Sequence, residues 1–554
     1  MTTAFVAIVC LLLQATPKPA VLQGHVVRAG SSAPVAHARI VVAKVGGTQR
    51  DYRTASSDAS GRFTVANLSP GTYRVYATRE GYRPGEYGRR GVGATGVPIV
   101  LAEDQTSPDL EIVMTPTGAI AGRVTEGARP LRNAWVRALK ARYSDGSRTL
   151  SIVEWAQTDD RGEYRLYGLS PGLYLVAAIP ADRPRIDGDQ LVVPAMPSNA
   201  TRNLTATRST LTLANLTAAA FDRRVFPPVY YPGTTDQAAA LPVEVRGGET
   251  ALGVDLSVAA MPTFHVRGRV AVVGADPLAE VIVGMYPADG ATFLRIPNPP
   301  VVAGSFDFPS VPPGRYQLTA QTKIPQGPLL RDTMAVDVVD RDVDGLAITL
   351  RPGVAVVGTL SIDGRPPSAA DPPTLVQLQS SVGGYGAVRV EPDGSFTIEG
   401  VTPREYRFRV IQGTRAAWIR SARFGEDDVT NAPVRVGGDL QGRQLDIVVG
   451  ASTQKIDALV LDADRQPVPG VLVIAVPDRS RRTLSRGYRS ATTGADGRAR
   501  IDGLAPGEHV LFATETIEAL DWQDPAVLER QEGRGTPVQL REGENKSVTL
   551  KITS

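Results

Sequence analysis

Four histidines and several neighbouring carboxylates are the residues of this 554-residue chain that could bind a metal ion or transfer protons. A catalytic zinc site needs His and Glu ligands around an open coordination position. None of the histidines is followed by Glu at ligand spacing, since the local sequences are HVVR, HARI, HVRG and HVLF at His25, His37, His265 and His509. We therefore expect ordinary strand histidines and predict no metal site.

Other motifs of catalysis and cofactor binding are also weak. The pairs Asp159–Asp160 and Asp427–Asp428 could serve acid–base chemistry or bind calcium, but they stand in polar turns where solvated or backbone-capping carboxylates are usual. There is no G-x-S-x-G nucleophile motif and no phosphate loop. GVGATG at 91–96 matches G-x-G-x-x-G, yet it precedes the strand-like VPIVLAE rather than a helix, so we interpret it as a flexible loop. We predict no catalytic residue, no cofactor and no enzyme activity.

Aromatic side chains could still bind a ligand, because an exposed ring offers an apolar face to a sugar. Trp135 stands inside the alternating segment NAWVRAL, so we expect it in a core. Tyr230 and Tyr231 border the turn at Pro232-Gly233, and the other three tryptophans stand in less regular surroundings. The candidate ligand-binding residues are therefore Trp155, Tyr230, Tyr231, Trp418 and Trp522.

The charge balance argues against a nucleic-acid partner. The chain has 60 Lys and Arg against 57 Asp and Glu, without a long run of one sign, whereas nucleic-acid binders concentrate a basic stripe. The expected partner is instead an unknown polysaccharide or surface protein.

The first twenty residues, MTTAFVAIVCLLLQATPKPA, resemble an export signal and a short linker. The apolar stretch from Ala4 to Leu13 has the length of a signal peptide and is far shorter than the ~20 residues that span a bilayer. Cleavage near Ala15 would remove Cys10, the single cysteine, and leave no disulfide or thiolate site. We predict an exported protein, periplasmic, at the cell surface or secreted, without a transmembrane segment.

A motif of about twenty residues recurs five times and defines the architecture. DASGRFTVANLSPGTYRVYA at 58–77 returns as DDRGEYRLYGLSPGLYLVAA from residue 159. Its opening glycines are Gly61, Gly162, Gly304, Gly394 and Gly497. Two residues later stand Phe63, Tyr164, Phe306, Phe396 and Ala499. The Pro-Gly step is kept at Gly71, Gly172, Gly314 and Gly507 but reads Pro-Arg at Arg404. It is followed by Tyr73, Tyr174, Tyr316, Tyr406 and His509.

Each motif predicts two strands joined by a turn. The alternation Phe63-x-Val65 has the period of a half-buried strand, and Leu-x-Pro-Gly supplies turn residues. We therefore predict a β-hairpin, with Asp side chains capping backbone N–H groups in the turn before it. Alternating strands before and after each motif indicate an all-β chain of five tandem antiparallel Greek-key-type β-sandwiches. The predicted units are 21–116, 117–261, 262–352, 353–451 and 452–554, and unit 2 carries a long insertion near 180–227.

The signature D-x-x-G-x-Y/F-x-ϕ-x-x-L-x-P-G-x-Y resembles that of the carboxypeptidase regulatory-like domain. The resemblance implies a seven-stranded, transthyretin-like (prealbumin-like) sandwich, related to starch-binding-type and collagen-adhesin B-type repeats, in an exported bacterial protein. It carries no reaction with it. Adhesin relatives form Lys–Asn or Lys–Asp bonds assisted by a buried acid. Apolar residues stand where that acid usually lies, namely Ala77, Ala178, Ala320, Val410 and Ala513, so we expect no such bond.

Three functions fit these observations. The first is a non-catalytic exported scaffold or adhesive spacer, which repeated units with diverged surfaces favour. The second is a carbohydrate-binding surface protein that uses the aromatic candidates. The third is an accessory subunit of a peptidase, which rests on the family resemblance alone.

Overall fold

The computed structural model describes most of the chain, and the residues it covers are 18–48, 52–91, 93–144, 147–180, 185–187, 190–192, 224–273, 280–288, 296, 298–322, 330–380, 383–384, 387–413, 415–450, 454–482, 484, 487–515 and 521–553. The predicted signal sequence and most of the predicted insertion in unit 2 lie outside these residues. In the described part of the chain, no helix combines the length and the apolar character needed to cross a membrane.

Unit 1 shows how the alternating pattern becomes two packed sheets. In β1 the side chains of Ala20, Leu22 and Val26 are buried and intervening ones are more exposed, as a strand with one face on a core requires. One sheet contains β4 (Arg62–Leu68), β1 (Ala20–Arg28) and β8 (Thr106–Met114). The other contains β3 (Tyr52–Ser56), β2 (Arg39–Lys44), β5 (Gly71–Thr78), β6 (Gly85–Glu86) and β7 (Ile99–Leu101).

Unit 2 repeats this plan with longer strands. One sheet contains β10 (Arg129–Pro130), β9 (Gly118–Glu126), β13 (Glu163–Leu169), β20 (Thr250–Ala251) and β21 (Leu256–Val258). The other contains β12 (Ser147–Gln157), β11 (Trp135–Ser144), β14 (Gly172–Ile179), β18 (Val229–Tyr230) and β19 (Val243–Val245). Smaller elements are β15 (Arg185–Asp187), β16 (Gln190–Val192), β17 (Arg224–Val225), β22 (Met261–Pro262) and the 3-10 helix η2 (Gln237–Ala239).

Units 3 and 4 keep the same strand order. The first sheet of unit 3 contains β25 (Ser305–Val311), β23 (Phe264–Val272) and β28 (Val343–Leu350). Its second sheet contains β24 (Val281–Pro287), β26 (Gly314–Thr322) and β27 (Arg331–Val338). The first sheet of unit 4 contains β33 (Ser395–Val401), β29 (Val354–Ile362), β39 (Leu445–Val449), β36 (Ile419–Phe424) and β37 (Asp427–Asp428). Its second sheet contains β31 (Gly383–Gly384), β30 (Thr374–Ser380), β34 (Arg404–Gln412), β35 (Arg415–Ala416), β32 (Val388–Arg389) and β38 (Val434–Val436).

Unit 5 differs because its two sheets are hydrogen-bonded into one. The strands are β42 (Arg489–Thr492), β41 (Leu472–Pro477), β44 (Gly507–Thr514), β46 (Asn545–Thr553), β40 (Gln454–Leu461), β43 (Arg498–Leu504) and β45 (Thr536–Leu540). The unit also holds the 3-10 helices η3 (Arg479–Arg481) and η5 (Asp521–Gln523), and the helix α1 (Pro525–Gln531).

The first strand of every unit pairs on both sides, once antiparallel and once parallel. In unit 1, β1 lies antiparallel to β4 and parallel to the closing strand β8. The parallel partner of β23 is β28, that of β29 is β39, and that of β40 is β46, while β9 pairs in parallel with both β20 and β21. The chain is therefore all-β as predicted and mostly antiparallel, with parallel pairing added between the first and closing strands.

The prediction of a hairpin in the repeated motif is wrong. β4 pairs with β1, whereas β5 pairs with β2 in the opposite sheet. The Leu-x-Pro-Gly step therefore carries the chain from one sheet to the other. Alternation within each strand identified both strands correctly, but it contains no information about which strand lies beside which.

The tyrosine after this step fixes the crossing. Tyr73 is buried, and its hydroxyl donates to the carbonyl oxygen of Ser69, four residues earlier, at 2.6 Å. The same bond recurs in units 2, 3 and 4 at 2.8, 2.8 and 2.9 Å, from Tyr174, Tyr316 and Tyr406. Burial of each ring therefore comes with a satisfied hydroxyl, as buried polar groups require. The glycine of the step has a positive φ in units 1 to 3, for example 148° at Gly172, whereas unit 4 has Arg404 there.

The aromatic residue of the motif is matched to a glycine in the first strand. Phe63 lies directly opposite Gly24, and a Cβ added to Gly24 would lie 2.9 Å from Phe63 Cζ. Units 2, 3 and 4 repeat the glycine–aromatic pairing. In unit 5 the paired residues are Ala458 and Ala499. Ala499, which replaces the motif aromatic, is thus accompanied by Ala458, which replaces the glycine of the first strand.

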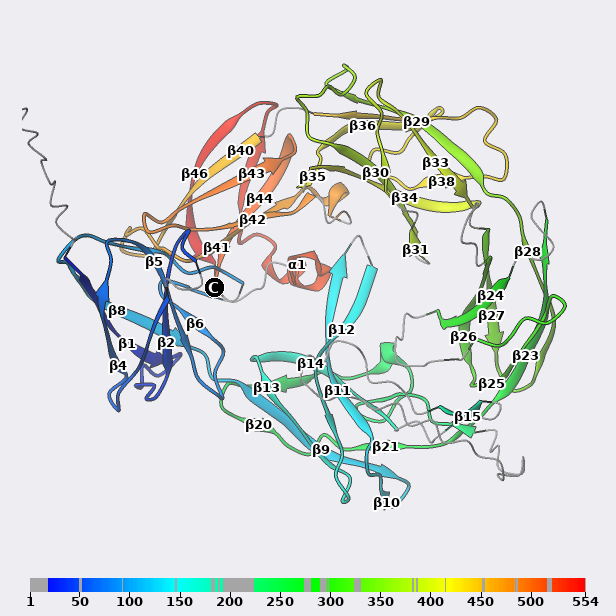
Figure 1. The fold of residues 1–554 in the computed structure, drawn as a ribbon, viewed down its shortest axis with the longest axis horizontal. Coiled ribbons are helices and arrows are strands. Elements are labelled where there is room, and N and C mark those ends of the chain that lie inside the picture. Colours follow the sequence, from blue (N-terminus) through cyan, green and yellow to red (C-terminus); the bar gives the residue numbers. More distant parts are fainter. Residues whose placement is uncertain are drawn as a thin grey trace, which may run out of the picture.

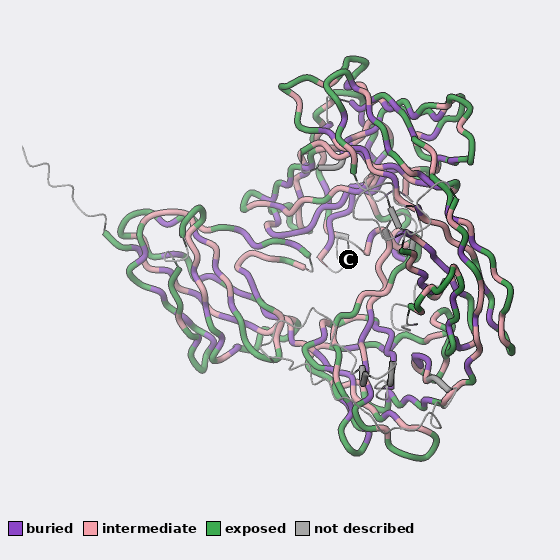
Figure 2. Tube along the Cα trace, turned by 45° about the vertical axis from the view of Figure 1, so that its right-hand side comes forward, coloured by how far each residue is buried: buried purple, intermediate pink, exposed green. Residues whose placement is uncertain are grey.

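Each group of strands surrounds its own buried cluster of apolar residues, drawn from within 20–114, 120–258, 266–350, 356–449 and 456–550. Figure 2 shows buried residues running along the strands, with many of the exposed ones in the turns between them. In Figure 1 the groups follow one another around a circuit, and unit 5 lies beside unit 1. The exact boundaries of the five units stay a prediction.

Candidate functional site

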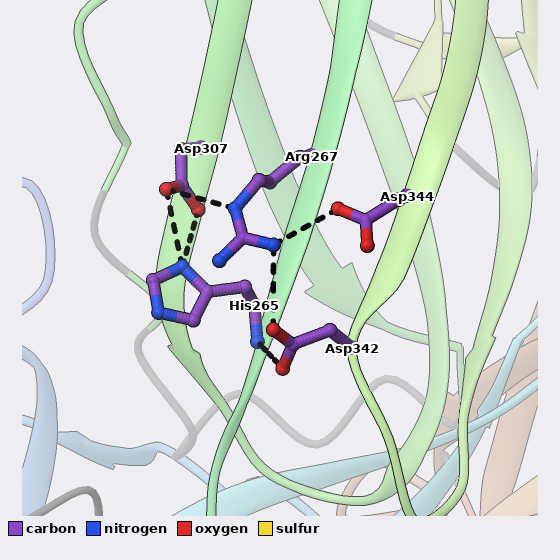
Figure 3. A network of polar contacts seen from close by, with 5 residues as sticks. All are labelled: His265, Arg267, Asp307, Asp342 and Asp344. Atoms are coloured by element: carbon purple, nitrogen blue, oxygen red, sulfur yellow. Dashed lines mark hydrogen bonds and ion pairs between the residues drawn. The ribbon is translucent and has the colours of Figure 1, made fainter.

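A network of polar side chains in unit 3 lies on the outer face of one sheet (Figure 3). Arg267 on β23 reaches Asp307 on β25 at 3.3 Å, Asp342 at 3.3 Å and Asp344 on β28 at 2.9 Å. His265 Nδ1 lies 2.8 Å from an Asp307 oxygen. One guanidinium therefore joins the central strand to both of its neighbours.

The electrostatics of this network favour a structural role. The backbone N–H of His265 donates to Asp342 at 2.9 Å, and this bond, with Arg267 close by, lowers the pKa of the Asp342 carboxyl. The hydrogen bond with Asp344 raises the pKa of Arg267. The side chains remain partly exposed, and exposed ion pairs contribute little each. Arg267 forms ion pairs with all three aspartates, so the network holds the central strand of this sheet to its two neighbours.

A cavity of about 620 Å³ adjoins this network, and its lining includes Arg267, Arg269, Val302, Ser305 and Asp307. It is a groove on the same face of the sheet, with an exposed guanidinium at Arg269. The Phe306 ring is buried beneath it and cannot serve as a stacking platform. Sequence reasoning missed this site, although the spacing of His265 and Arg267 places both on one face of a strand.

Of the five aromatic candidates, Trp155 is the one with an exposed side chain, 38% accessible on β12. Its ring packs edge-on against Trp135 of β11, with centroids 4.8 Å apart and planes at 61°. Arg137 lies directly opposite Trp155, and burial lowers the pKa of its guanidinium. The prediction that Trp135 lies in a core is wrong, because Val136 and Ala138 face inward and Trp135 is half-buried on the opposite face.

The other four candidates are held in packing contacts. Tyr230 is fully buried in a small cluster with Leu139 and Leu175 on the outer side of the unit 2 sheet. Tyr231 is half-buried against the unit 2 core. Trp418 is half-buried below Arg420, whose guanidinium carbon lies 5.5 Å from the ring centroid.

Trp522 is completely buried and packs on Phe512, with ring centroids 4.4 Å apart. A sugar-stacking platform needs a ring open to solvent, so Trp522 and Tyr230 do not have the exposure that this role requires. The structure does not bring the five candidates together at one site.

The Asp-rich turns use their carboxylates on the backbone, as predicted. Asp58 Oδ1 accepts from the N–H groups of Ser60 and Arg62, and Asp159 Oδ1 accepts from those of Arg161 and Glu163. Hydrogen bonding to Ser60 and Arg62 lowers the pKa of Asp58. Within the described residues, no group of three or more His, Cys, Asp or Glu side chains is placed to hold a metal ion.

His25 and His509 lie in two different kinds of surroundings. His25 is near Asp109 and Glu111 on the exposed face of β8, at 3.0 and 3.4 Å. His509 is instead buried in unit 5 at the position of the motif tyrosine, and its Nδ1 lies 3.3 Å from the carbonyl of Gly507. Burial, together with Arg481 nearby, lowers the pKa of His509 to about 4.

Comparison with protein families identifies the first unit. Residues 21–115 match the family described as "Carboxypeptidase regulatory-like domain". The sequence of unit 1 is therefore similar to that of this family. The resemblance inferred from the motif is confirmed for this unit, and units 2 to 5 share its motif and strand order. No curated protein matches the chain significantly.

Solved structures similar to the chain include two pilins. The Bacillus anthracis TIE protein is 11% identical, with 94% of this chain and 69% of that chain covered and a TM-score of 0.13. The shaft pilin SpaA of Lactobacillus rhamnosus GG is 12% identical, covering 45% of this chain and 98% of its own, with a TM-score of 0.20. GBS52, a minor pilin of Streptococcus agalactiae, is 11% identical, covering 44% and 97%, with a TM-score of 0.20. At these scores we draw no functional conclusion from the likeness.

Proposed function

We propose that the protein is a non-catalytic, exported scaffold or adhesive spacer built from carboxypeptidase regulatory-like sandwiches. The observation that carries this proposal is the use made of the repeated residues. The motif aromatic packs on a glycine, the motif tyrosine bonds the crossing between sheets, and the aspartates cap turns. The glycine–aromatic pairing and the tyrosine bond recur in units 1 to 4, so what is repeated is the means of folding a sandwich, while the outer faces differ from unit to unit.

Differences between the outer faces support a spacer that presents unlike surfaces. Unit 2 exposes a tryptophan beside a half-buried arginine, and unit 3 exposes a charged groove. Export is supported by the apolar stretch from Ala4 to Leu13 and by the position of Cys10 within it.

The proposal predicts that the protein lies outside the cytoplasm and catalyses no reaction. Antibody labelling of intact cells and fractionation should place the protein outside the cytoplasm. The purified mature chain should give background rates in peptidase, esterase and glycosidase panels, with and without added divalent metals. Reproducible turnover that a chelator abolishes would overturn the non-catalytic part, and retention in the cytoplasm would overturn the part concerning export.

A second candidate function is carbohydrate binding, and the Trp155 surface favours it. The ring of Trp155 is exposed, Trp135 holds it from one edge, and Arg137 lies opposite it on the neighbouring strand. A rigid aromatic face beside a hydrogen-bond donor is a common way to hold a sugar ring.

A glycan array tests the second function directly. Dose-dependent binding that Trp155→Ala abolishes would support it. Tyr167→Ala is the matched control, because Tyr167 is 60% exposed in the same unit but lies on β13, in the other sheet. An equal loss of glycan binding in both variants, or no glycan binding by the unmodified chain, would rule out the carbohydrate-binding function.

A further inference from the structure

Unit 5 has a second apolar cluster outside its sandwich core. The core lies between the sheets, whereas the second cluster covers the outer face of β41 and β44 and includes Leu472, Ile474, Val476, Phe512, Trp522 and Leu528. It also contains Ala94, which belongs to unit 1 and is 6% exposed. A residue from the first unit thus completes an apolar cluster of the last.

The segment that brings Ala94 there is the loop at 88–97, which includes the GVGATG stretch. Glu86 is buried at its base, where its carboxylate accepts from the N–H of Gly96 at 2.8 Å and pairs with Arg74 at 2.6 Å. Ala94 makes no part of the unit 1 core. The loop is therefore anchored within unit 1 while its tip is directed away from it.

Backbone contacts join this loop to unit 5. The N–H of Arg90 donates to the carbonyl of Gly470 at 2.8 Å, and that of Thr95 donates to Thr492 Oγ1 at 3.3 Å. A Cβ on Gly470 would lie 1.6 Å from the carbonyl oxygen of Gly88. Only a glycine admits so close an approach, so the two units meet backbone to backbone.

A second, independent contact joins unit 5 to unit 2. The segment formed by η5 and α1, residues 521–531, is fixed to unit 5 by Trp522, which is fully buried against Phe512. In the same segment Asp521 lies 3.3 Å from Lys140 of β11, and both side chains are only 23% exposed. Figure 1 places α1 between unit 5 and the β11–β12 pair.

We propose that the outer face of unit 5 is an interaction surface whose partner is loop 88–97 of the same chain, so that the array is a closed ring. We define the closing interface as this loop, Lys140 and the outer face of unit 5 with segment 521–531. Tethering makes the contact intramolecular, with an effective concentration in the millimolar range, so a small interface is sufficient. This inference goes beyond the proposed function and stands without it.

Small-angle scattering of the full mature chain tests the closure. A unit of ~100 residues is roughly 35 Å across, so a straight open row of five would be roughly twice as long as a closed ring of the same units. Ala94→Glu places a charge in the apolar cluster and should increase the maximum dimension by about this factor. Ala66→Glu, at an exposed position of β4, is the matched control and should leave it unchanged.

Trp522→Ala should open the ring by disrupting the unit 5 side of the closing interface. Trp522→Phe should keep it closed, because the indole N–H donates to no other described residue and the apolar contact remains. Hydrogen exchange in β40 and β43 shows whether the unit 5 sandwich stays folded. If Trp522→Ala unfolds it, Ala94→Glu decides, since Ala94 lies outside both sandwich cores.

Covalent trapping identifies which chain supplies the loop. In the double variant Thr95→Cys, Thr492→Cys, mild oxidation should give a disulfide within one chain, which migrates faster than the reduced form in a non-reducing gel. A disulfide between two chains would instead assign the surface to a second copy. An extended unmodified chain in scattering, or an unchanged dimension in Ala94→Glu with no intrachain disulfide, would overturn the proposal.

Discussion

The alanine pair of unit 5 predicts an energetic coupling that can be measured. Ala458 and Ala499 lie opposite each other where the other units pair a glycine with an aromatic ring. In unit 1, a Cβ on Gly24 would lie 2.9 Å from Phe63 Cζ, well inside normal contact. A phenyl ring at position 499 should therefore overlap the methyl group of Ala458.

The magnitudes follow from this geometry. Ala499→Phe adds a ring to a filled core, which typically costs about 1–3 kcal/mol of unfolding free energy. Ala458→Gly alone should cost about 0.5–1 kcal/mol, since glycine weakens a strand interior. The double variant restores the pairing of units 1 to 4, so we expect the two changes together to cost roughly 1–2 kcal/mol less than their sum.

Native-state hydrogen exchange in the full chain is the assay, because it reports each unit separately. Peptides from β40 and β43 give the free energy of unit 5, and peptides from β1 provide an internal reference. Single effects that add to the double effect within about 0.3–0.5 kcal/mol would refute the reasoning. So would a stable Ala499→Phe variant.

Further predictions concern the motif and pH. Tyr174→Ala should lower the unfolding free energy of unit 2 by about 3–5 kcal/mol and produce new proteolytic cleavage confined to 117–261. Tyr174→Phe loses one hydrogen bond and should cost about 1 kcal/mol. Full protection of unit 2 from the protease in both variants would contradict this prediction. The pKa of His509 is lowered on folding to about 4, so unit 5 should be most stable above pH 6.5 and lose up to about 3 kcal/mol as pH falls to 4. His509→Tyr should flatten that pH profile in thermal melts. Both Gly162 and Gly172 have positive φ, but Gly162→Ala should destabilise unit 2 more in denaturant titrations, because a Cβ on Gly162 would lie 2.4 Å from the carbonyl oxygen of Val124, whereas one on Gly172 would meet no described atom within 4 Å.

The sequence predicted what depends on local pattern. Alternation placed the strands, and the positions of Asp58 and Asp159 indicated capped turns that the structure contains. These features depend on neighbours within a few residues, where strand period and turn chemistry are decisive. The period of a half-buried strand in Phe63-x-Val65 is such a feature, and both side chains are buried.

Features that depend on distant segments could not be predicted in the same way. Alternation shows that a strand has two faces without showing which face lies on the core, so Trp135 was assigned to the wrong one. The pairing of β4 and β5 with different sheets has no local signature. Trp522 of η5 is buried because it packs on Phe512 at the outer face of β44. Thr95 in the same way contacts Thr492, 397 residues further along the chain. No short window of sequence contains such contacts.

The parallel pairing of the first and closing strands has a mechanical consequence. In unit 1, β1 enters the sandwich at one end and β8, lying beside it in the same direction, leaves at the other. Tension along the chain therefore pulls these two strands past each other lengthwise. Their hydrogen bonds, from Val21 to Met114, are loaded together in shear rather than broken one after another. A unit pulled at its two ends should therefore withstand a larger force than one whose terminal strands separate bond by bond.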